Sequence, residues 1–416
     1  MSVTTGVYAA DAAPRRIAGA VPLVERAAAR AAEADEAGRT AVLEEFWAEV
    51  ASRGTPLVEA LDDDPDHRAV TFLWRGHRAT RQVLLIAEGI ADRADLAASR
   101  LSPLPGTDIW HLTYRLRADH RGSYRMAADI SPGEPPASAE LLQRRLLSLS
   151  AHAAPDPLNR RAMPGRWPDR DFSVCELPRA PALPGAGLRA GVPRGSVERH
   201  RLPAGVLGTE RDVWAYLPPG GRTAGLTVLV LHDGDMWFGR LAFQDTLDAL
   251  VADGTVPPLA VLAPDAVDRD TRTRELGAHD SHVRFLADEL LPWAAGRLPL
   301  TTDPARTLVA GQGLGGLTSL YAGLLRPERF GNVLAQSAPV SGLDVSASRP
   351  VGASRPLTVR LDVGLHEKEI LDHHHDLHET LRSRDCRVTL NAYNGGHDWA
   401  CWRACLAEGL VGLLGH

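Results

Sequence analysis

The feature that most constrains the fold is an alternation of continuous apolar runs with helix-like segments in the second half of the chain. The apolar runs, each ending in polar or glycine-containing residues, are TVLVLHDGD, LAVLAPDAVD, RTLVAGQGLGG, NVLAQSAPV and LTVRLDVGLHE. The segments that alternate with them are FQDTLDALVADG, HVRFLADELLPWAAGRL, LTSLYAGLLRPERFG and EILDHHHDLHETLRSR. Continuous apolar strands that alternate with helices are typical of a parallel sheet covered on both faces. The pattern predicts an α/β domain over residues 195–416.

In a sheet of this kind, chemistry takes place at the carboxyl ends of the strands. The residues that fall at these ends are His232, Asp233, Asp265, Gly311 to Gly316, Ser337, Glu367 and His397. The segment VAGQGLGGLTSLYAG is a strand, a sharp turn and a helix, which is the context of the nucleophile elbow G-x-S-x-G of α/β-hydrolases. Gly311 and Gly315 occupy the two flanking positions, and Gly313 occupies the central position, where a serine is expected.

An acid and a histidine follow the elbow in the order that α/β-hydrolases use. Glu367 comes after the last apolar run, and His397 lies in NGGHDWACWR. We therefore predict His397 as a general base and Glu367 as the residue that orients it, with Asp362 and Glu369 as alternatives for the acid. The backbone N–H groups of Leu314 and Asp235 are predicted to form an oxyanion hole.

The first part of the chain has a different pattern. Residues 20–62 carry alanine, leucine and acidic residues at helical spacing, which predicts a helical N-terminal segment over residues 1–62. The short runs AVTFLWRG, RQVLLIAEG, DIWHLTYRLRA and GSYRMAAD have strand-like composition and predict a small antiparallel β-sandwich over residues 63–150. Residues 151–194 are rich in proline, arginine and alanine, which predicts a linker between two domains.

Composition excludes several classes of protein. The net charge of −6 argues against a binder of nucleic acid, which requires a basic surface. No stretch of eighteen uncharged apolar residues and no signal peptide pattern is visible, so we expect no membrane segment. The four cysteines contain no C-x-x-C pair, which fits reduced thiols and a cytoplasmic protein. The number of subunits stays open.

The sequence resembles the enterochelin (ferric enterobactin) esterases over most of its length. The resemblance rests on VTFLWR, GTDIWHLTYRLRADHRGSYRM, DPLNR, LHDGDMWFG, RTRELG, DELLPW, VAGQGLGGL, YAGLLRPERFGNVLAQS and GGHDWACWR. It implies an esterase-D-like α/β-hydrolase domain with an N-terminal sandwich of the Ig-like (E-set) type. It also implies cytoplasmic hydrolysis of a small-molecule substrate, a catecholate trilactone siderophore, with release of its iron. No metal or organic cofactor of the protein is implied, although the substrate brings Fe(III).

Members of that family place a serine in G-Q-S-x-G-G, and this chain departs from the pattern at Gly313. Three hypotheses follow. The protein is an inactive variant that still binds ferric siderophore, or a water in the vacated space is activated by His397, or the pocket serves non-hydrolytic chemistry in biosynthesis. Cys401, one helical turn after His397, fits packing better than a substitute nucleophile.

Several other residues have both a functional and a structural interpretation. Arg274, next to Glu275, either meets an anionic catecholate or forms an ion pair. Trp237 and Trp399 either offer aromatic faces to catechol rings or belong to the core. The histidines of one helix suggest a solvated face rather than a metal site, because only one pair has zinc-type spacing: His373, His374, His375 and His378. The GQGLGG turn does not match the dinucleotide pattern G-x-G-x-x-G in register.

Overall fold

The computed structural model describes residues 13–19, 21–131, 136–167, 171–185, 190–221, 225–343, 345 and 356–415. Residues 1–12 of the predicted helical segment and parts of the predicted linker therefore lie outside the described residues. The chain divides into two compact units. Unit 1 comprises Met1–Ala180 and Asn394–Ala400, and unit 2 comprises Pro181–Tyr393 and Cys401–His416. Among the described helices, none combines the length and the apolar character needed to cross a membrane.

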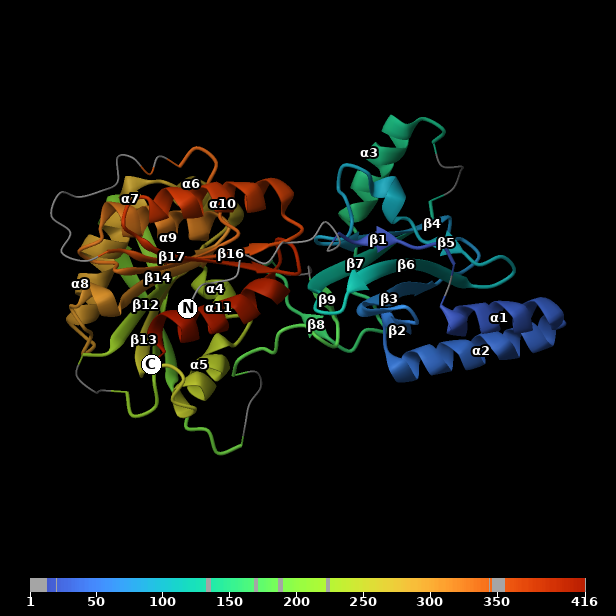
Figure 1. The fold of residues 1–416 in the computed structure, drawn as a ribbon, viewed down its shortest axis with the longest axis horizontal. Helices are drawn as coiled ribbons and strands as arrows, with labels where there is room; N and C mark the ends of the chain where they lie inside the picture. The colour runs from blue at the N-terminus through green and yellow to red at the C-terminus, as the bar shows by residue number, and fades with distance from the viewer. Residues whose placement is uncertain are drawn as a thin grey trace. The chain divides into compact units, whose positions relative to one another are not determined.

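Unit 1 is a sandwich of two antiparallel sheets. Its elements are β1 (Arg15–Arg16), α1 (Pro22–Glu33), α2 (Glu36–Arg53), β2 (Leu57–Leu61), β3 (Asp64–Arg75), β4 (Gln82–Ala87), β5 (Ser102–Pro103), β6 (Ile109–Arg117), β7 (Arg121–Asp129), α3 (Ala139–Ser150), β8 (Ala162–Met163) and β9 (Phe172–Glu176). One sheet has the order β1-β6-β3-β2 with β5 on β6, and the other has the order β4-β7-β9-β8. Helices α1 and α2 form a pair beside the first sheet (Figure 1).

The core of the sandwich lies between the two sheets. Phe72 and Leu112 come from β3 and β6 of one sheet, and Leu85 and Tyr124 come from β4 and β7 of the other. The Tyr124 ring meets the Phe72 ring edge to face, with 4.9 Å between the centroids. The predicted N-terminal β-sandwich is confirmed, because each sheet contributes side chains to this shared core.

The range 151–194, expected to be a linker, contains two strands. β8 and β9 lie inside it, and β9 pairs with β7, where Cys175 faces Gly122 and Val174 faces Ser123. The contacts divide after Ala180 rather than at 150. The strand β9 has the sequence FSVCE, and its residues alternate in burial. Five residues between prolines and arginines are too few to predict a strand from the sequence alone. The strand is stabilised by its pairing with β7.

Unit 2 is built on an eight-stranded sheet with the order β10-β11-β13-β12-β14-β15-β16-β17. Its strands are β10 (Ser196–Ala204), β11 (Thr209–Leu217), β12 (Thr227–Leu231), β13 (Leu259–Pro264), β14 (Thr307–Gln312), β15 (Asn332–Gln336), β16 (Thr358–Gly364) and β17 (Arg387–Tyr393). Its helices are α4 (Gly234–Trp237), α5 (Phe243–Ala252), α6 (Arg269–Glu275), α7 (Asp280–Arg284), α8 (Leu291–Ala295), α9 (Leu314–Leu325), α10 (Lys368–Arg382) and α11 (Trp399–Leu414). From β13 to β17 every pair of neighbours is parallel, and β10, β11 and β13 pair antiparallel.

Helices cover both faces of this sheet, with α9 and α10 on one side and α5 and α11 on the other (Figure 1). Two glycines show how closely the helices approach. A Cβ on Gly323 of α9 would lie 2.3 Å from a methyl carbon of Val333, and a Cβ on Gly409 of α11 would lie 2.1 Å from a methyl carbon of Leu334. Because adjacent residues of a strand point to opposite faces, Val333 and Leu334 of β15 mark the two faces of the sheet. The predicted α/β domain is confirmed, and its five apolar runs are β12 to β16.

Candidate active site

The elbow lies between β14 and α9. Gly313 separates the last residue of the strand from the first residue of the helix and has φ 55° and ψ −124°. The flanking glycines are required by close contacts, because a Cβ on Gly311 would lie 2.6 Å from the carbonyl carbon of Gly315. A Cβ on Gly315 would lie 3.0 Å from the Cβ of His232. The turn therefore has the tight geometry that the glycine spacing predicts, and Gly313 adopts a backbone conformation that favours glycine.

A second turn follows β12, the neighbour of β14. Asp233 has a positive φ of 68° and precedes α4. Asp235 lies in the first turn of α4, and its Oδ1 accepts a hydrogen bond of 3.0 Å from the N–H of Ala266. Leu314 is the first residue of α9. The N–H groups in the first turn of a helix have no intrahelical acceptor, so Asp235 and Leu314 occupy positions of the kind that an oxyanion hole uses.

Asp233 ties the two turns together. Its two carboxylate oxygens each accept a hydrogen bond of 2.8 Å from Arg272, and the side-chain amide of Gln312 donates to the same carboxylate. Arg272 also donates to the carbonyl oxygen of Gln312 at 3.3 Å. Because Gln312 directly precedes Gly313, this cluster joins the end of β12 to the elbow. Sequence analysis missed Arg272, although it opens the RTRELG motif.

Arg274, the arginine singled out from that motif, points elsewhere. Its side chain is 67% exposed and lies 3.9 Å from Glu275, with a hydrogen bond of 3.2 Å to Thr271. Glu275 itself receives two hydrogen bonds of 2.7 and 2.8 Å from the buried Arg211. Glu275 therefore forms a short, buried ion pair with Arg211 and a longer one with Arg274, which lies at the surface.

A small cavity of about 10 Å³, room for about one water, lies beside the cluster. It is lined in part by Arg211, Asp233, Glu275 and two histidines, His232 and His282, whose rings lie 5.4 Å apart at a tilt of 40°. The Nε2 of His232 and both ring nitrogens of His282 have no hydrogen-bond partner among the described residues. Burial lowers the pKa of His232 to about 4 and lowers that of His282 well below its usual range, so both rings are neutral near pH 7.

Glu367 follows β16 and is held in a buried network. Its Oε1 accepts hydrogen bonds from the Ser337 hydroxyl at 2.6 Å, the Gly364 N–H at 2.8 Å and the Tyr393 hydroxyl at 3.3 Å. The indole N–H of Trp402 donates to the Ser337 hydroxyl at 2.9 Å. The backbone of Ser337, which places the hydroxyl among these partners, has a positive φ of 47°. Sequence analysis placed Ser337 at the end of its strand but gave it no role, and it missed Tyr393 and Trp402.

The two alternative acids have other surroundings. Asp362 lies inside the sheet and pairs with Arg360 at 2.8 Å and with the Asn391 amide at 3.1 Å. Burial raises the pKa of Asp362 from its usual value, although its bonds to Arg360 oppose this effect. Glu369 is exposed on α10. Of the three, Glu367 is the one that is buried just beyond the carboxyl end of its strand.

His397 lies four residues after Tyr393, the last residue of β17, in the segment 394–400 that belongs to unit 1. Next to it, Asp398 caps α11 by accepting a hydrogen bond of 2.9 Å from the N–H of Ala400. Trp399 carries the Arg166 guanidinium 5.3 Å from its ring centroid, so one face of the indole is covered by a cation. Trp237 is fully buried, packs against Phe243 and donates to Gln312, which are the contacts of a core residue.

The described residues contain no cluster of three His, Cys, Asp or Glu side chains able to hold a metal ion. His374, one of the helix histidines, is buried and donates from Nδ1 to the carbonyl oxygen of Ile370 at 2.8 Å. Cys401 is 2% exposed within α11. Its burial agrees with the packing interpretation.

Comparison with known proteins identifies the family. Residues 69–186 match the family profile "Enterochelin esterase, N-terminal", and residues 204–413 match "Putative esterase". The chain is 33% identical over 398 residues to the iron(III) salmochelin esterase of Escherichia coli O6:H1, covering 91% of this chain and 95% of that protein. It is also 33% identical over 416 residues to the iron(III) enterobactin esterase of Dickeya dadantii, covering 89% and 93%.

A solved structure extends the match to the whole fold. The enterobactin esterase FES from Shigella flexneri, crystallised in the presence of enterobactin, superposes with a TM-score of 0.77 at 28% identity. The match covers 89% of this chain and 97% of that one. With both parts of the sequence and both parts of the fold matched, the chain belongs to the enterochelin esterase family.

Proposed function

We propose that this protein binds catecholate siderophore esters and hydrolyses them with a water molecule at the place that a serine occupies in the family pattern. The substrate class follows from the relatives, which are named as esterases of iron(III) enterobactin and iron(III) salmochelin. Fe(III) belongs to the substrate. The proposal rests on the backbone of the elbow. Gly313 has φ 55° and ψ −124°, and α9 begins at the next residue, Leu314, as a nucleophile elbow requires.

The reaction needs one water and no other co-reactant. The water oxygen bonds to the ester carbonyl carbon while His397 takes one of its protons. The carbonyl oxygen gains negative charge and accepts hydrogen bonds from the N–H groups of Leu314 and Asp235. The bond from the carbonyl carbon to the alcohol oxygen then breaks, and that oxygen takes the proton back from His397. The products are a carboxylic acid and an alcohol.

Glu367 supports this role of His397. Its carboxylate is buried, and Ser337, Gly364 and Tyr393 fix its position through three hydrogen bonds. A fixed carboxylate orients an imidazole and stabilises the imidazolium that forms during the reaction. In the chain, Glu367 follows β16 and His397 follows β17, its parallel neighbour, which is the order expected of an acid and a base in this fold.

We expect this reaction to be slow. Removal of the nucleophile from a serine hydrolase lowers turnover by about 10⁶-fold and leaves a rate roughly 10³ to 10⁴ times that of the uncatalysed reaction in water. A second candidate function, binding of ferric siderophore without turnover, is favoured by the lack of any side-chain oxygen at position 313. The two candidates share the binding site and differ in whether products form.

One experiment separates them. The protein is incubated with apo and ferric enterobactin, and products are followed by mass spectrometry beside Gly313→Ser, Gly313→Ala and His397→Ala. Slow turnover by the parent that is lost in His397→Ala supports water attack. If the parent binds the ligand, forms no product and gains turnover only with Gly313→Ser, the hydrolytic proposal is rejected in favour of binding.

A further inference from the structure

The segment that carries His397 is held by one loop and one turn of unit 1. The segment 394–400 connects β17 to α11 in the chain, yet its contacts place it in unit 1. The loop joins β6 of one sheet to β7 of the other and, with the strand ends beside it, spans residues 117–123. We infer that this β6–β7 loop fixes the conformation of the segment, so that Asp119, Asn394 and Asp398 are positioning residues for His397. The inference rests on the proposed role of His397 as the base.

The first anchor is Asn394. Its carbonyl oxygen accepts a hydrogen bond of 3.1 Å from the N–H of Arg121, and its side-chain amide donates to Asp119 at 2.5 Å. His120 lies 3.4 Å from the other end of the same amide. The backbone and side chain of Asn394 are therefore both bound by the β6–β7 loop.

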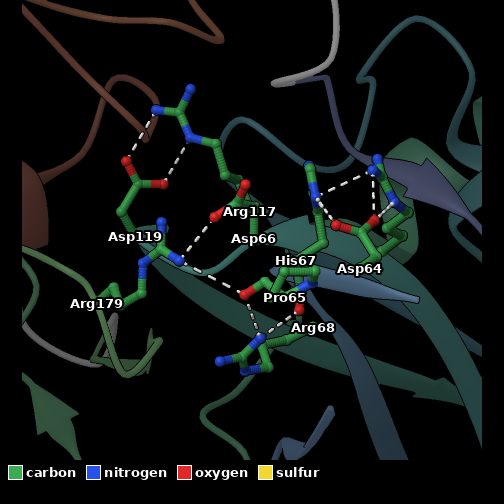
Figure 2. A network of polar contacts seen from close by, with 9 residues as sticks. Asp64, Pro65, Asp66, His67, Arg68, Arg117, Asp119 and Arg179 are labelled. Atoms are coloured by element: carbon green, nitrogen blue, oxygen red, sulfur yellow. Dashed lines mark hydrogen bonds and ion pairs between the residues drawn. The ribbon is translucent and has the colours of Figure 1, made fainter. Parts of the chain in front are cut away.

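Asp119 is itself fixed before it meets Asn394. Arg117 donates to both of its carboxylate oxygens, at 2.7 and 2.9 Å (Figure 2). Burial alone would raise the pKa of Asp119, but the hydrogen bonds from Arg117 and Asn394 outweigh it and lower that pKa. The carboxylate of Asp119 is therefore ionised and accepts a strong hydrogen bond from the side-chain amide of Asn394.

The second anchor is Gly396. A Cβ at this position would lie 2.9 Å from the backbone nitrogen of Gly89, in the turn that follows β4. The two backbones are therefore in direct contact, and the segment cannot move toward the turn. The contact leaves no space for a side chain at position 396.

The third anchor is Asp398, which directly follows His397. One of its oxygens accepts from the N–H of Ala400 and caps α11, and the other accepts from the N–H of Ser123 in β7. Asp398 is 3% exposed. Gly396 and Asp398 thus hold the backbone on both sides of His397, and the base takes its orientation from them. A shift of about 1 Å in a catalytic group can cost on the order of 10²-fold in rate.

The test uses the full chain with Gly313→Ser as an activity reporter and hydrogen exchange of residues 394–400 as a readout that needs no activity. Asn394→Asp puts a second carboxylate against Asp119 and removes the donor. Asn394→Ala removes the same donor without adding a charge, so the two variants together separate loss of the hydrogen bond from repulsion between carboxylates. Gln82→Glu is the matched control, because the buried Gln82 amide donates to Asp129 at 2.8 Å in the same unit, away from the segment.

We expect Asn394→Asp to lower kcat by about tenfold to 100-fold with little change in KM, and to speed exchange of residues 394–400 by about tenfold. Asn394→Ala should change both readouts in the same direction, and Gln82→Glu should change neither. Unchanged exchange in Asn394→Asp, or faster exchange in Asn394→Asp with none in Asn394→Ala, overturns the inference. If the parent protein forms no product, the proposed function fails, and the exchange rates still decide whether the β6–β7 loop holds the segment.

Discussion

Asp233 and Arg272 form a two-pronged ion pair in which both hydrogen bonds measure 2.8 Å and the carboxylate is fully buried. The pair joins the end of β12 to α6, and its link to Gln312 extends it to the elbow. A buried carboxylate that loses its cation keeps the cost of desolvation without the compensating attraction. The pair therefore holds the two turns of the candidate site in fixed positions.

Arg272→Met should lower the free energy of unfolding by about 3 kcal/mol or more, because it leaves Asp233 buried without its cation. Arg274→Met makes the same change two residues later, at an exposed side chain, and should stay within about 0.5 kcal/mol of the parent. Urea unfolding of the three proteins measures both effects. Similar losses in the two variants would show that Arg272 has no special role.

Gly313→Ser should destabilise the protein while it restores turnover. Any side chain at φ 55° is strained, at a cost of about 1 to 3 kcal/mol. Gly313→Ala introduces the same strain without a hydroxyl, so it should lose similar stability and gain no turnover. Thermal unfolding and product formation are measured on both variants. Equal turnover in the serine and alanine variants would contradict the assignment of Gly313 as the nucleophile position.

Glu367→Gln should reduce turnover in the Gly313→Ser protein by about 10²-fold or more, because an amide stabilises the imidazolium of His397 less than a carboxylate does. The exposed Glu369→Gln is the control and should leave turnover unchanged. Steady-state kinetics on ferric and apo substrate measures both variants. A larger effect at Glu369 than at Glu367 would reassign the acid.

Stability should fall on the acid side because of the buried histidines. The pKa of His282 in the folded state lies well below its value of about 6.5 in the unfolded chain. The unfolded state therefore binds more protons below pH 6.5, and stability is lost as the pH falls from there, by up to about 1.4 kcal/mol per pH unit for each such group.

His282→Leu should flatten this dependence below about pH 6.5, and the exposed His279→Leu should not. Asp398 has the opposite effect, because burial raises its pKa to about 6, and its contribution to stability falls as the pH rises toward that value. Urea unfolding at each pH gives the free energy of unfolding of the parent and of the His282→Leu protein, and the difference between the two isolates the contribution of His282. If this difference does not change with pH, His282 is not buried in its neutral form.

Sequence pattern alone determined the fold class and the order of the site. The runs that became β12 to β16 are continuously apolar, and a parallel sheet covered on both faces is the arrangement that buries such strands completely. The spacing of Gly311, Gly313 and Gly315 predicted the elbow, because a turn that tight excludes side chains. Glu367 was identified by its place after an apolar strand, since that place is set by topology.

Tertiary structure alone decided which neighbours these residues have. Arg272 rather than Arg274 meets Asp233, because the direction of each side chain on α6 depends on how the helix packs after β13. The partners of Glu367 come from the ends of three strands, and no local pattern relates Ser337 to Tyr393. The segment of His397 is held by a loop far away in the chain, as the bond from Asn394 to Asp119, 275 residues apart, shows. Hydrogen bonds across such separations follow from the packing of whole elements, which a single sequence does not encode in any local pattern.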